Sequence, residues 1–204
     1  MKRILLLLFS LGALDAGDLE MTVYDQANLP HDTLVTALQQ LRLILHRAGI
    51  TVRVDPGNLS DEEASLFVYA PPPRNAGTAC SARPDIALKI VAASPPGVPE
   101  TVLGVSSPFT RVGINVRLFN DHIREAASRH NRPYAIVLSY AMAHEIGHVL
   151  LRNITHDSRG IMSAVWTEQE YSRMHVDGNM YFPEDEAKSM LSDILRTSCR
   201  TSDR

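Results

Sequence analysis

One short segment of the sequence carries residues that could bind a metal ion and activate water. His144 and His148 stand four residues apart, and Glu145 follows the first of them, in a stretch whose apolar residues predict a buried helix. Residues four apart on an α-helix differ by about 40° in direction and about 6 Å in height, so both imidazoles can converge on one ion. Glu145 is rotated by about 100° from His144 and therefore lies beside the ion rather than beneath it.

The residue types of this segment suit zinc chemistry. Neutral imidazole is a good zinc ligand, and three protein ligands leave a fourth position for water. The ion lowers the pKa of that water to about 7, so Glu145 can accept its proton while the hydroxide attacks a carbonyl carbon. We therefore expect Glu145 to be a general base in the hydrolysis of a carbonyl compound.

The residues after this helix extend the pattern with a third histidine and the sequence Gly-Ile-Met. The whole segment resembles the metzincin zinc peptidases, whose long motif adds a third histidine and then a tight turn with a methionine under the metal. The resemblance spans about twenty residues. It implies that His144, His148 and His156 bind one zinc ion, that Glu145 is the general base, and that Met162 is the turn methionine.

Two positions depart from the metzincin pattern. Leu151 stands where the family has a glycine, and Ile154 stands where it has the third histidine. Ile154 has no donor atom, so His156, two residues later, is the candidate ligand. To reach the ion the chain must leave the helix near Arg152 and turn back, and Asn153 tolerates the left-handed conformation that such a turn often needs.

Several other residues near the motif have open roles. Asp157 could bind the ion in place of His156 or accept its second N–H, although a solvated loop carboxylate is commoner. A more distant ligand, as in thermolysin-like enzymes, could come from four glutamates: Glu168, Glu170, Glu184 and Glu186. Three aromatic residues could face a cleft or simply pack: Tyr140, Trp166 and Tyr171. The segment also resembles small exported bacterial proteins that share His-Glu-x-x-His-x-Leu-Leu, a later histidine, Gly-Ile-Met and a nearby tryptophan.

The surrounding sequence predicts an α+β fold. Strands are expected at Leu19–Tyr24, Ile50–Val54, Asp85–Val91, Thr101–Val105 and Val112–Leu118. Helices are expected at Pro30–Gly49, with Asp32 capping its start, at part of Asn120–Asn131, at Pro133–Arg152 and from about Pro183. By resemblance, we expect a metzincin-like mixed β-sheet with the first helix and the central zinc-ligand helix packed on it, followed by a short C-terminal helical lobe.

Composition and termini bound the class of protein. The chain has 204 residues and a formal net charge of -3 without a long Lys/Arg run, so neither nucleic acid nor an anionic membrane is an expected partner. Residues 1–16 have the layout of a signal peptide, with an apolar run too short for a stable membrane anchor. Residues 17–204 are expected to form one domain, with an N-terminal lobe to about residue 152 and a C-terminal lobe from about 153. Cys80 and Cys199 permit one disulfide or two free thiols.

These patterns lead to one preferred function and two alternatives. We expect a secreted or periplasmic zinc endopeptidase that acts on peptide or protein substrates. By resemblance, the segment Thr101–Ser107 is the sheet edge along which an extended peptide would bind. One alternative is a non-catalytic exported zinc protein whose metal structures a partner-binding loop, in which case a fourth protein ligand is expected. The other, a zinc hydrolase for a non-peptide amide, shares the same residues.

Overall fold

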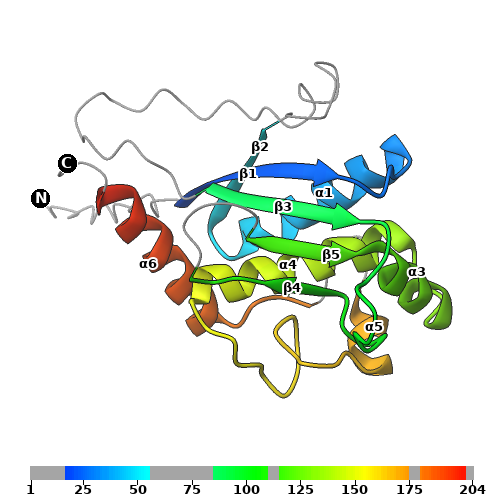
Figure 1. The fold of residues 1–204 in the computed structure, drawn as a ribbon. Coiled ribbons are helices and arrows are strands. Elements are labelled where there is room, and N and C mark those ends of the chain that lie inside the picture. Colours follow the sequence, from blue (N-terminus) through cyan, green and yellow to red (C-terminus); the bar gives the residue numbers. More distant parts are fainter. Residues whose placement is uncertain (1–16, 56–84, 110–114, 175–179, 201–204) are drawn as a thin grey trace, which may run out of the picture.

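The computed structural model describes residues 17–55, 85–109, 115–174 and 180–200, and these residues form an α+β fold (Figure 1). The elements in chain order are β1 (Gly17–Asp25), α1 (His31–Arg47), β2 (Ile50–Asp55), β3 (Asp85–Val91), β4 (Gly104–Ser106), β5 (Val116–Phe119), α3 (Asn120–Arg129), α4 (Tyr134–Leu151), α5 (Glu168–Arg173) and α6 (Glu184–Arg200). The predicted fold class is confirmed. The predicted signal peptide, Cys80 and the side chain of Cys199 lie outside the described residues.

The described strands form one mixed sheet with the order β2-β1-β3-β5-β4. The first four strands of this order run parallel, and β4 pairs antiparallel with β5. Among the strands that the structure describes, β4 is therefore an edge strand. The helix α4, which carries His144 and His148, packs next to β4 and β5, so this edge strand lies close to the two histidines.

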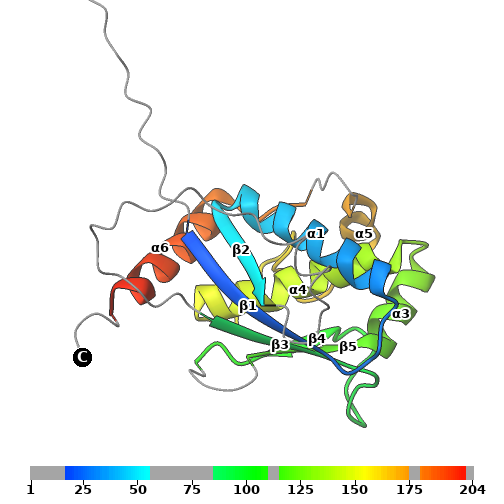
Figure 2. The same ribbon diagram turned by 90° about the horizontal axis from the view of Figure 1, so that it is seen from above.

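The helices α1 and α4 pack together on one face of the sheet (Figure 2). In β3, Ile86, Leu88 and Ile90 are buried while the residues between them are partly exposed, which is the period of two that one covered face produces. The helix α4 is long and apolar enough to span a membrane by length and composition. However, 72% of it is buried inside the protein, as in the core helix that its sequence predicts.

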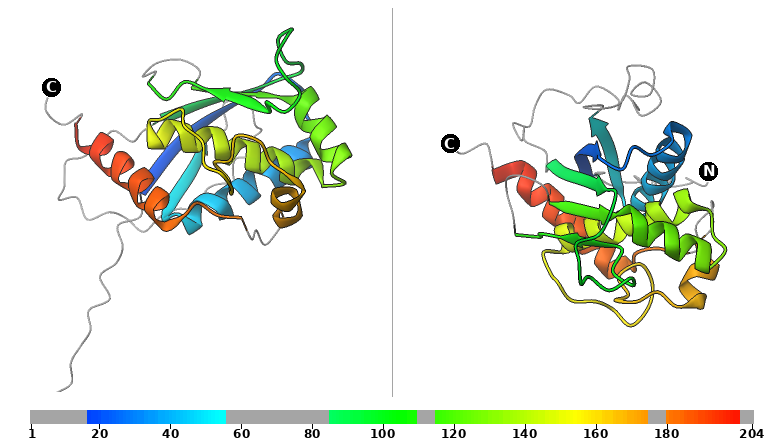
Figure 3. Two further views of the ribbon diagram at one scale, coloured as in Figure 1. Left: turned by 90° about the horizontal axis from the view of Figure 1, so that it is seen from below. Right: turned by 45° about the vertical axis from the view of Figure 1, so that its right-hand side comes forward.

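The helix α6 lies at the end of the sheet where β1 begins (Figure 3). A Cβ atom at Gly17 would lie 2.7 Å from Leu191 Cδ1 and 3.1 Å from Ile194 Cγ2, so a larger residue here would have to displace these side chains of α6. Met190 and Ile194 of α6 are buried, whereas Leu195 on the same helix is 40% exposed.

Several local predictions differ from the structure. Asp32 does not cap α1, because the N-cap residue is Pro30 and Asp32 already lies in the first turn. The predicted strand Thr101–Val105 is shorter and shifted, since pairing with β5 begins only at Gly104. The strand predicted over Val112–Leu118 is described only from Val116, because residues 110–114 lie outside the described part of the chain.

Candidate metal centre and its cleft

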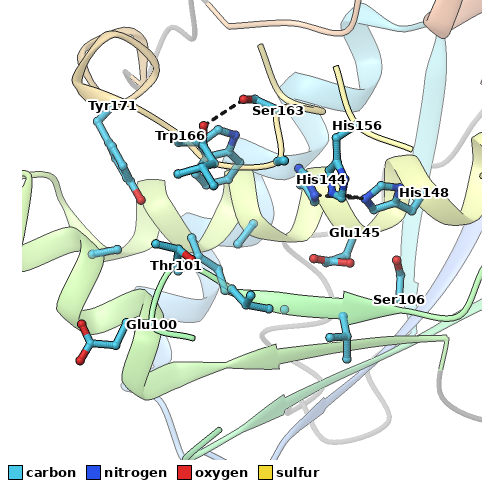
Figure 4. Close-up of a pocket in the computed structure, with 18 of the residues that line it drawn as sticks. Glu100, Thr101, Ser106, His144, Glu145, His148, His156, Ser163, Trp166 and Tyr171 are labelled. Carbon is cyan, nitrogen blue, oxygen red and sulfur yellow. Dashed lines mark hydrogen bonds between the residues drawn. The ribbon is translucent and has the colours of Figure 1, made fainter. Parts of the chain in front are cut away.

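Two histidines of α4 point to the same place. The Nε2 atoms of His144 and His148 lie 3.2 Å apart, and their rings meet edge to face at 82°. This arrangement follows from their spacing, because residues four apart share one face of a helix. Figure 4 shows both rings on the cleft side of α4.

His156 comes to this place from the segment after α4. Its Nε2 lies 3.2 Å from Nε2 of His148, and ligand atoms of His144, His148 and His156 all lie within 4.8 Å of one another. The chain turns back at Arg152, which has φ 52 and ψ 41, rather than at Asn153 as the sequence suggested. Arg152 is held there by an ion pair from its Nε to Asp193 Oδ1 of α6, at 2.9 Å.

The hydrogen bonds of the two helix histidines fix which ring nitrogen carries the proton. His144 Nδ1 lies 2.7 Å from the carbonyl oxygen of Ile161, and His148 Nδ1 lies 3.1 Å from that of Asn153. A carbonyl oxygen only accepts, so each Nδ1 is the donor and each Nε2 keeps a free lone pair. Two lone pairs facing each other at 3.2 Å repel unless a cation lies between them.

The electrostatic environment keeps these imidazoles neutral. The pKa of His144 is lowered to about 4, mainly by burial and to a smaller extent by the neighbouring imidazoles of His148 and His156, while the hydrogen bond to Ile161 acts in the opposite direction. Burial is also the main cause that lowers the pKa of His148. Both side chains are thus in the neutral form that binds metal ions at neutral pH.

Glu145 lies beside the three histidines and faces β4. Its side chain is 6% exposed, and the hydroxyl of Ser106 donates a hydrogen bond to its carboxylate. Burial raises the pKa of Glu145 to about 7, and the Ser106 hydrogen bond partly offsets this rise. The carboxyl group can therefore take up and release a proton near neutral pH.

The close approach of β4 to Glu145 depends on Gly104. A Cβ atom at this position would lie 2.9 Å from the Arg117 carbonyl oxygen and 3.0 Å from Glu145 Cγ. Both contacts are shorter than real side chains accept, so a larger residue would push β4 away from α4. The sequence analysis named the segment Thr101–Ser107 as a substrate edge by resemblance, but it did not single out Gly104 or Ser106 beside Glu145, because no local motif connects them to the histidine segment.

Met162 lies under the helix, between the two ligand positions. It is 3% exposed, and a Cβ atom at Gly147 would lie 2.5 Å from its sulfur. The turn before it uses Gly160 at φ 85, and the Asp157 N–H donates to the Met162 carbonyl at 2.8 Å. The Met162 side chain thus packs against the backbone of α4 at Gly147.

The other candidate ligands have different partners. Asp157 forms a hydrogen bond with Glu186, and burial followed by this contact raises the pKa of Glu186 to about 8. Glu168 binds His130, Glu170 caps α5 through Thr167, and Glu184 pairs with Lys188. Tyr140 is fully buried in the core. Within the part of the chain that the structure describes, the candidate metal group consists of the three histidines alone.

A cleft of about 340 Å³ extends from the histidines along α4. One wall is β4 with the loop before it, and the opposite wall is the segment from Ser163 to Trp166 (Figure 4). Trp166 meets His144 edge to face at 5.8 Å and also lines the cleft, as does Tyr171. The volume lies in the range of small-ligand sites.

Comparisons with known proteins do not assign this arrangement: no family model, curated protein or solved structure matches the chain.

Proposed function

We propose that this chain is an exported zinc-dependent endopeptidase in which Glu145 is the general base and His144, His148 and His156 are the metal ligands. The observation that carries the proposal is the convergence of the three histidines in one group, beside the buried carboxyl group of Glu145. The resemblance to metzincins supports the same residues, on the motif alone.

The geometry of the three histidines fits a zinc ion. Ligand nitrogens about 2.0 to 2.1 Å from a tetrahedral zinc ion lie about 3.3 Å apart. The Nε2 atom of His148 lies 3.2 Å from those of both His144 and His156, and ligand atoms of all three histidines lie within 4.8 Å of one another. Three neutral histidines are also a ligand set that catalytic zinc sites use, because it leaves a position open for water. When bound, zinc would make this water acidic and stabilise the oxyanion that develops on the substrate.

The residues around this position would carry out the proton transfers. Glu145 would accept the proton of the attacking water and later deliver it to the leaving amine. The Ser106 hydroxyl faces this carboxylate from β4 and stabilises its ionised form.

The surroundings of the site favour a peptide over a compact small molecule. The free edge of β4 could add the main chain of a peptide as a further strand. Three exposed apolar side chains line the cleft, namely Val105, Ile154 and Val165, at 44%, 71% and 52% exposure. Exposed apolar side chains gathered around a cleft are typical of surfaces that bind another chain.

The non-catalytic alternative requires a fourth protein ligand. Asp157 is the nearest candidate in the sequence, but its side chain is hydrogen-bonded to Glu186 of α6. The described residues offer three ligands, which supports the catalytic reading. The proposal of export rests on the leader pattern of residues 1–16, and N-terminal sequencing of chain recovered from the periplasm or medium of a bacterial host would test it.

The deciding experiment compares Glu145→Gln with the unchanged chain. Zinc-loaded protein is incubated with a diverse peptide library, and cleavage is followed by mass spectrometry. Glu145→Gln should keep one zinc ion but lose activity by at least about a hundredfold, because the proton acceptor is removed. The control Glu184→Gln makes the same chemical change at an exposed residue and should keep full activity. Full activity of Glu145→Gln, or no cleavage by the zinc-loaded unchanged chain, would reject the proposal.

A further inference from the structure

The end of the cleft farthest from the histidines is formed by Tyr171 and its neighbours. Tyr171 is 5% exposed, and its ring stacks on His130 at 3.8 Å with an angle of 9° between the planes. The other side of the ring meets the edge of Trp166 at 6.0 Å. His130 is itself held by Glu168, whose carboxylate lies 2.6 Å from Nδ1. These contacts leave the Tyr171 ring little freedom to move.

The hydroxyl of this buried tyrosine points into the cleft. Figure 4 shows it directed toward the space between α4 and Thr101. The ring is packed, and the hydroxyl borders the open space of the cleft. Burial raises the pKa of Tyr171 to about 12, so the hydroxyl keeps its proton and can donate. A ligand in the cleft can therefore reach this hydroxyl and form a hydrogen bond with it.

The walls leading to this hydroxyl are apolar and small. Ala126 of α3 and Ala141 of α4 are both buried and both line the cleft, with Leu103 on the wall of β4. A larger residue at either alanine would fill the space between Trp166 and the loop before β4. The pocket is therefore open because of two alanines, and it suits a flat apolar group with a polar atom at its far end.

Charges near this end argue against a charged ligand. The guanidinium of Arg129 lies 2.8 Å from the Glu100 carboxylate and 3.1 Å from that of Glu125, so its charge is already neutralised. Glu168 adds a further carboxylate beside His130. An acidic side chain would meet an excess of negative charge here, and an ammonium group would find Glu100 already paired with Arg129.

We propose that this part of the cleft is a specificity pocket for a tyrosine side chain of the substrate, next to the bond that is cut. The phenol ring would lie between Trp166 and Leu103, and its hydroxyl would bond to that of Tyr171. A phenylalanine would fill the same space but leave the Tyr171 hydroxyl without a partner. This inference deepens the proposed peptidase function and rests on it for the nature of the substrate, but the pocket itself can be tested by binding alone.

Trp166 provides the readout, because it is the only tryptophan of the chain and lines the pocket. The zinc-loaded chain is titrated with N-acetyltyrosinamide and with N-acetylphenylalaninamide, and tryptophan emission is excited at a wavelength that tyrosine does not absorb. The tyrosine amide should bind about three- to tenfold more tightly, as expected for one neutral hydrogen bond. Tyr171→Phe should bind both compounds equally, with the affinity for the phenylalanine compound unchanged.

Two further variants test the place of binding. Ala126→Leu and Ala141→Leu each fill the pocket and should weaken the binding of both amides by more than about tenfold. Thermal unfolding followed by circular dichroism shows which of the two variants is folded, and either one suffices. Equal affinities in the unchanged chain, a tyrosine preference that persists in Tyr171→Phe, or the absence of saturable binding would overturn the inference.

The outcome is separable from that of the proposed function. A tyrosine preference that Tyr171→Phe abolishes would establish the pocket even if no peptide is cleaved. Cleavage by the zinc-loaded chain without a tyrosine next to the cut bond would leave the peptidase standing and refute the pocket assignment. Mapping the cut sites in the peptide library gives this second result directly.

Discussion

His144 and Trp166 donate hydrogen bonds to the same acceptor, the carbonyl oxygen of Ile161. The donor distances are 2.7 Å from His144 Nδ1 and 3.2 Å from Trp166 Nε1. A single peptide unit therefore orients a candidate metal ligand and one wall of the cleft. Changes at the metal centre should reach Trp166 through this carbonyl and through the direct edge-to-face contact of the two rings.

Zinc binding should for this reason change the emission of Trp166. We expect a titration of metal-free protein with zinc to saturate at one ion per chain. His156→Ala should lose the ion far more readily than Asp157→Ala during dialysis against a chelator, because His156 contributes a ligand atom and Asp157 is bonded to Glu186. Loss of one direct ligand should exceed the roughly 10- to 100-fold effect of removing an outer partner. The opposite order of the two variants would show that the ligand assignment is wrong.

The sequence predicted those parts of the site that depend on local geometry. The helix Pro133–Arg152 was predicted within a residue at each end, because its apolar period and starting proline act within the segment itself. The convergence of His144 and His148 follows from the same helix geometry. The position of Ser106 beside Glu145 was not predicted, because it depends on contacts between distant parts of the sequence. Ser106 lies about forty residues before Glu145 in the sequence, and only the sheet pairing of β4 brings it into hydrogen-bonding distance.

The turn after α4 and the start of α5 show two different limits of prediction from local sequence rules. Asn153 is the better left-handed residue by propensity, yet Arg152 takes that conformation, and its side chain forms an ion pair with Asp193 of α6, a tertiary contact that the local sequence does not reveal. The short helix α5 was not predicted, although Thr167 and Glu170 have the spacing of a capping box and form one in the structure. The conformation of Arg152 can be predicted only when the position of α6 is known, whereas the capping box of α5 can be recognised in the sequence alone.

The buried Glu145 should reduce the stability of the metal-free protein at neutral and higher pH. Because burial raises its pKa to about 7 from an ordinary value near 4.5, ionisation costs more in the folded than in the unfolded chain. The penalty is complete above about pH 7 and disappears as pH falls to about 4.5. In excess chelator, Glu145→Gln should therefore be more stable than the unchanged chain by about 1 to 3 kcal/mol at about pH 8, and equal to it at about pH 4.5.

His144 acts in the opposite direction, but this effect cancels in the comparison. Its pKa is lowered from 6.5 to about 4, so between these pH values the unfolded chain binds a proton that the folded chain excludes. The free energy of unfolding therefore decreases as the pH is lowered from 6.5 to about 4. Both proteins share this loss, so the difference between their unfolding midpoints isolates Glu145. A constant difference across the whole pH range would mean that ionisation of Glu145 is not its cause.

The contact between Gly147 and Met162 should couple the stability of α4 to that of the turn beneath it. In Gly147→Ala the new methyl group would lie 2.5 Å from the Met162 sulfur and 3.0 Å from Phe182 Cε1. Alanine favours the helix by about 1 kcal/mol, but crowding of a packed core costs about 1 to 3 kcal/mol, so we expect a net loss of stability. Met162→Ala should cost about 2 to 5 kcal/mol by leaving a cavity, and should weaken folding more than catalysis.

The double variant distinguishes this contact from general damage. Gly147→Ala combined with Met162→Ala should be more stable than the sum of the two single losses by at least about 1 kcal/mol, because the cavity accepts the methyl group. Gly160→Ala is the matched control. Gly160 precedes Met162 by two residues and has φ 85, but a Cβ atom there would meet nothing within 4 Å, so its cost arises from the backbone and should not be relieved by Met162→Ala. Denaturant unfolding of the metal-free proteins gives each free energy. If the losses of Gly147→Ala and Met162→Ala simply add, the two residues do not constrain each other, and Met162 is not what holds the turn against the ligand helix.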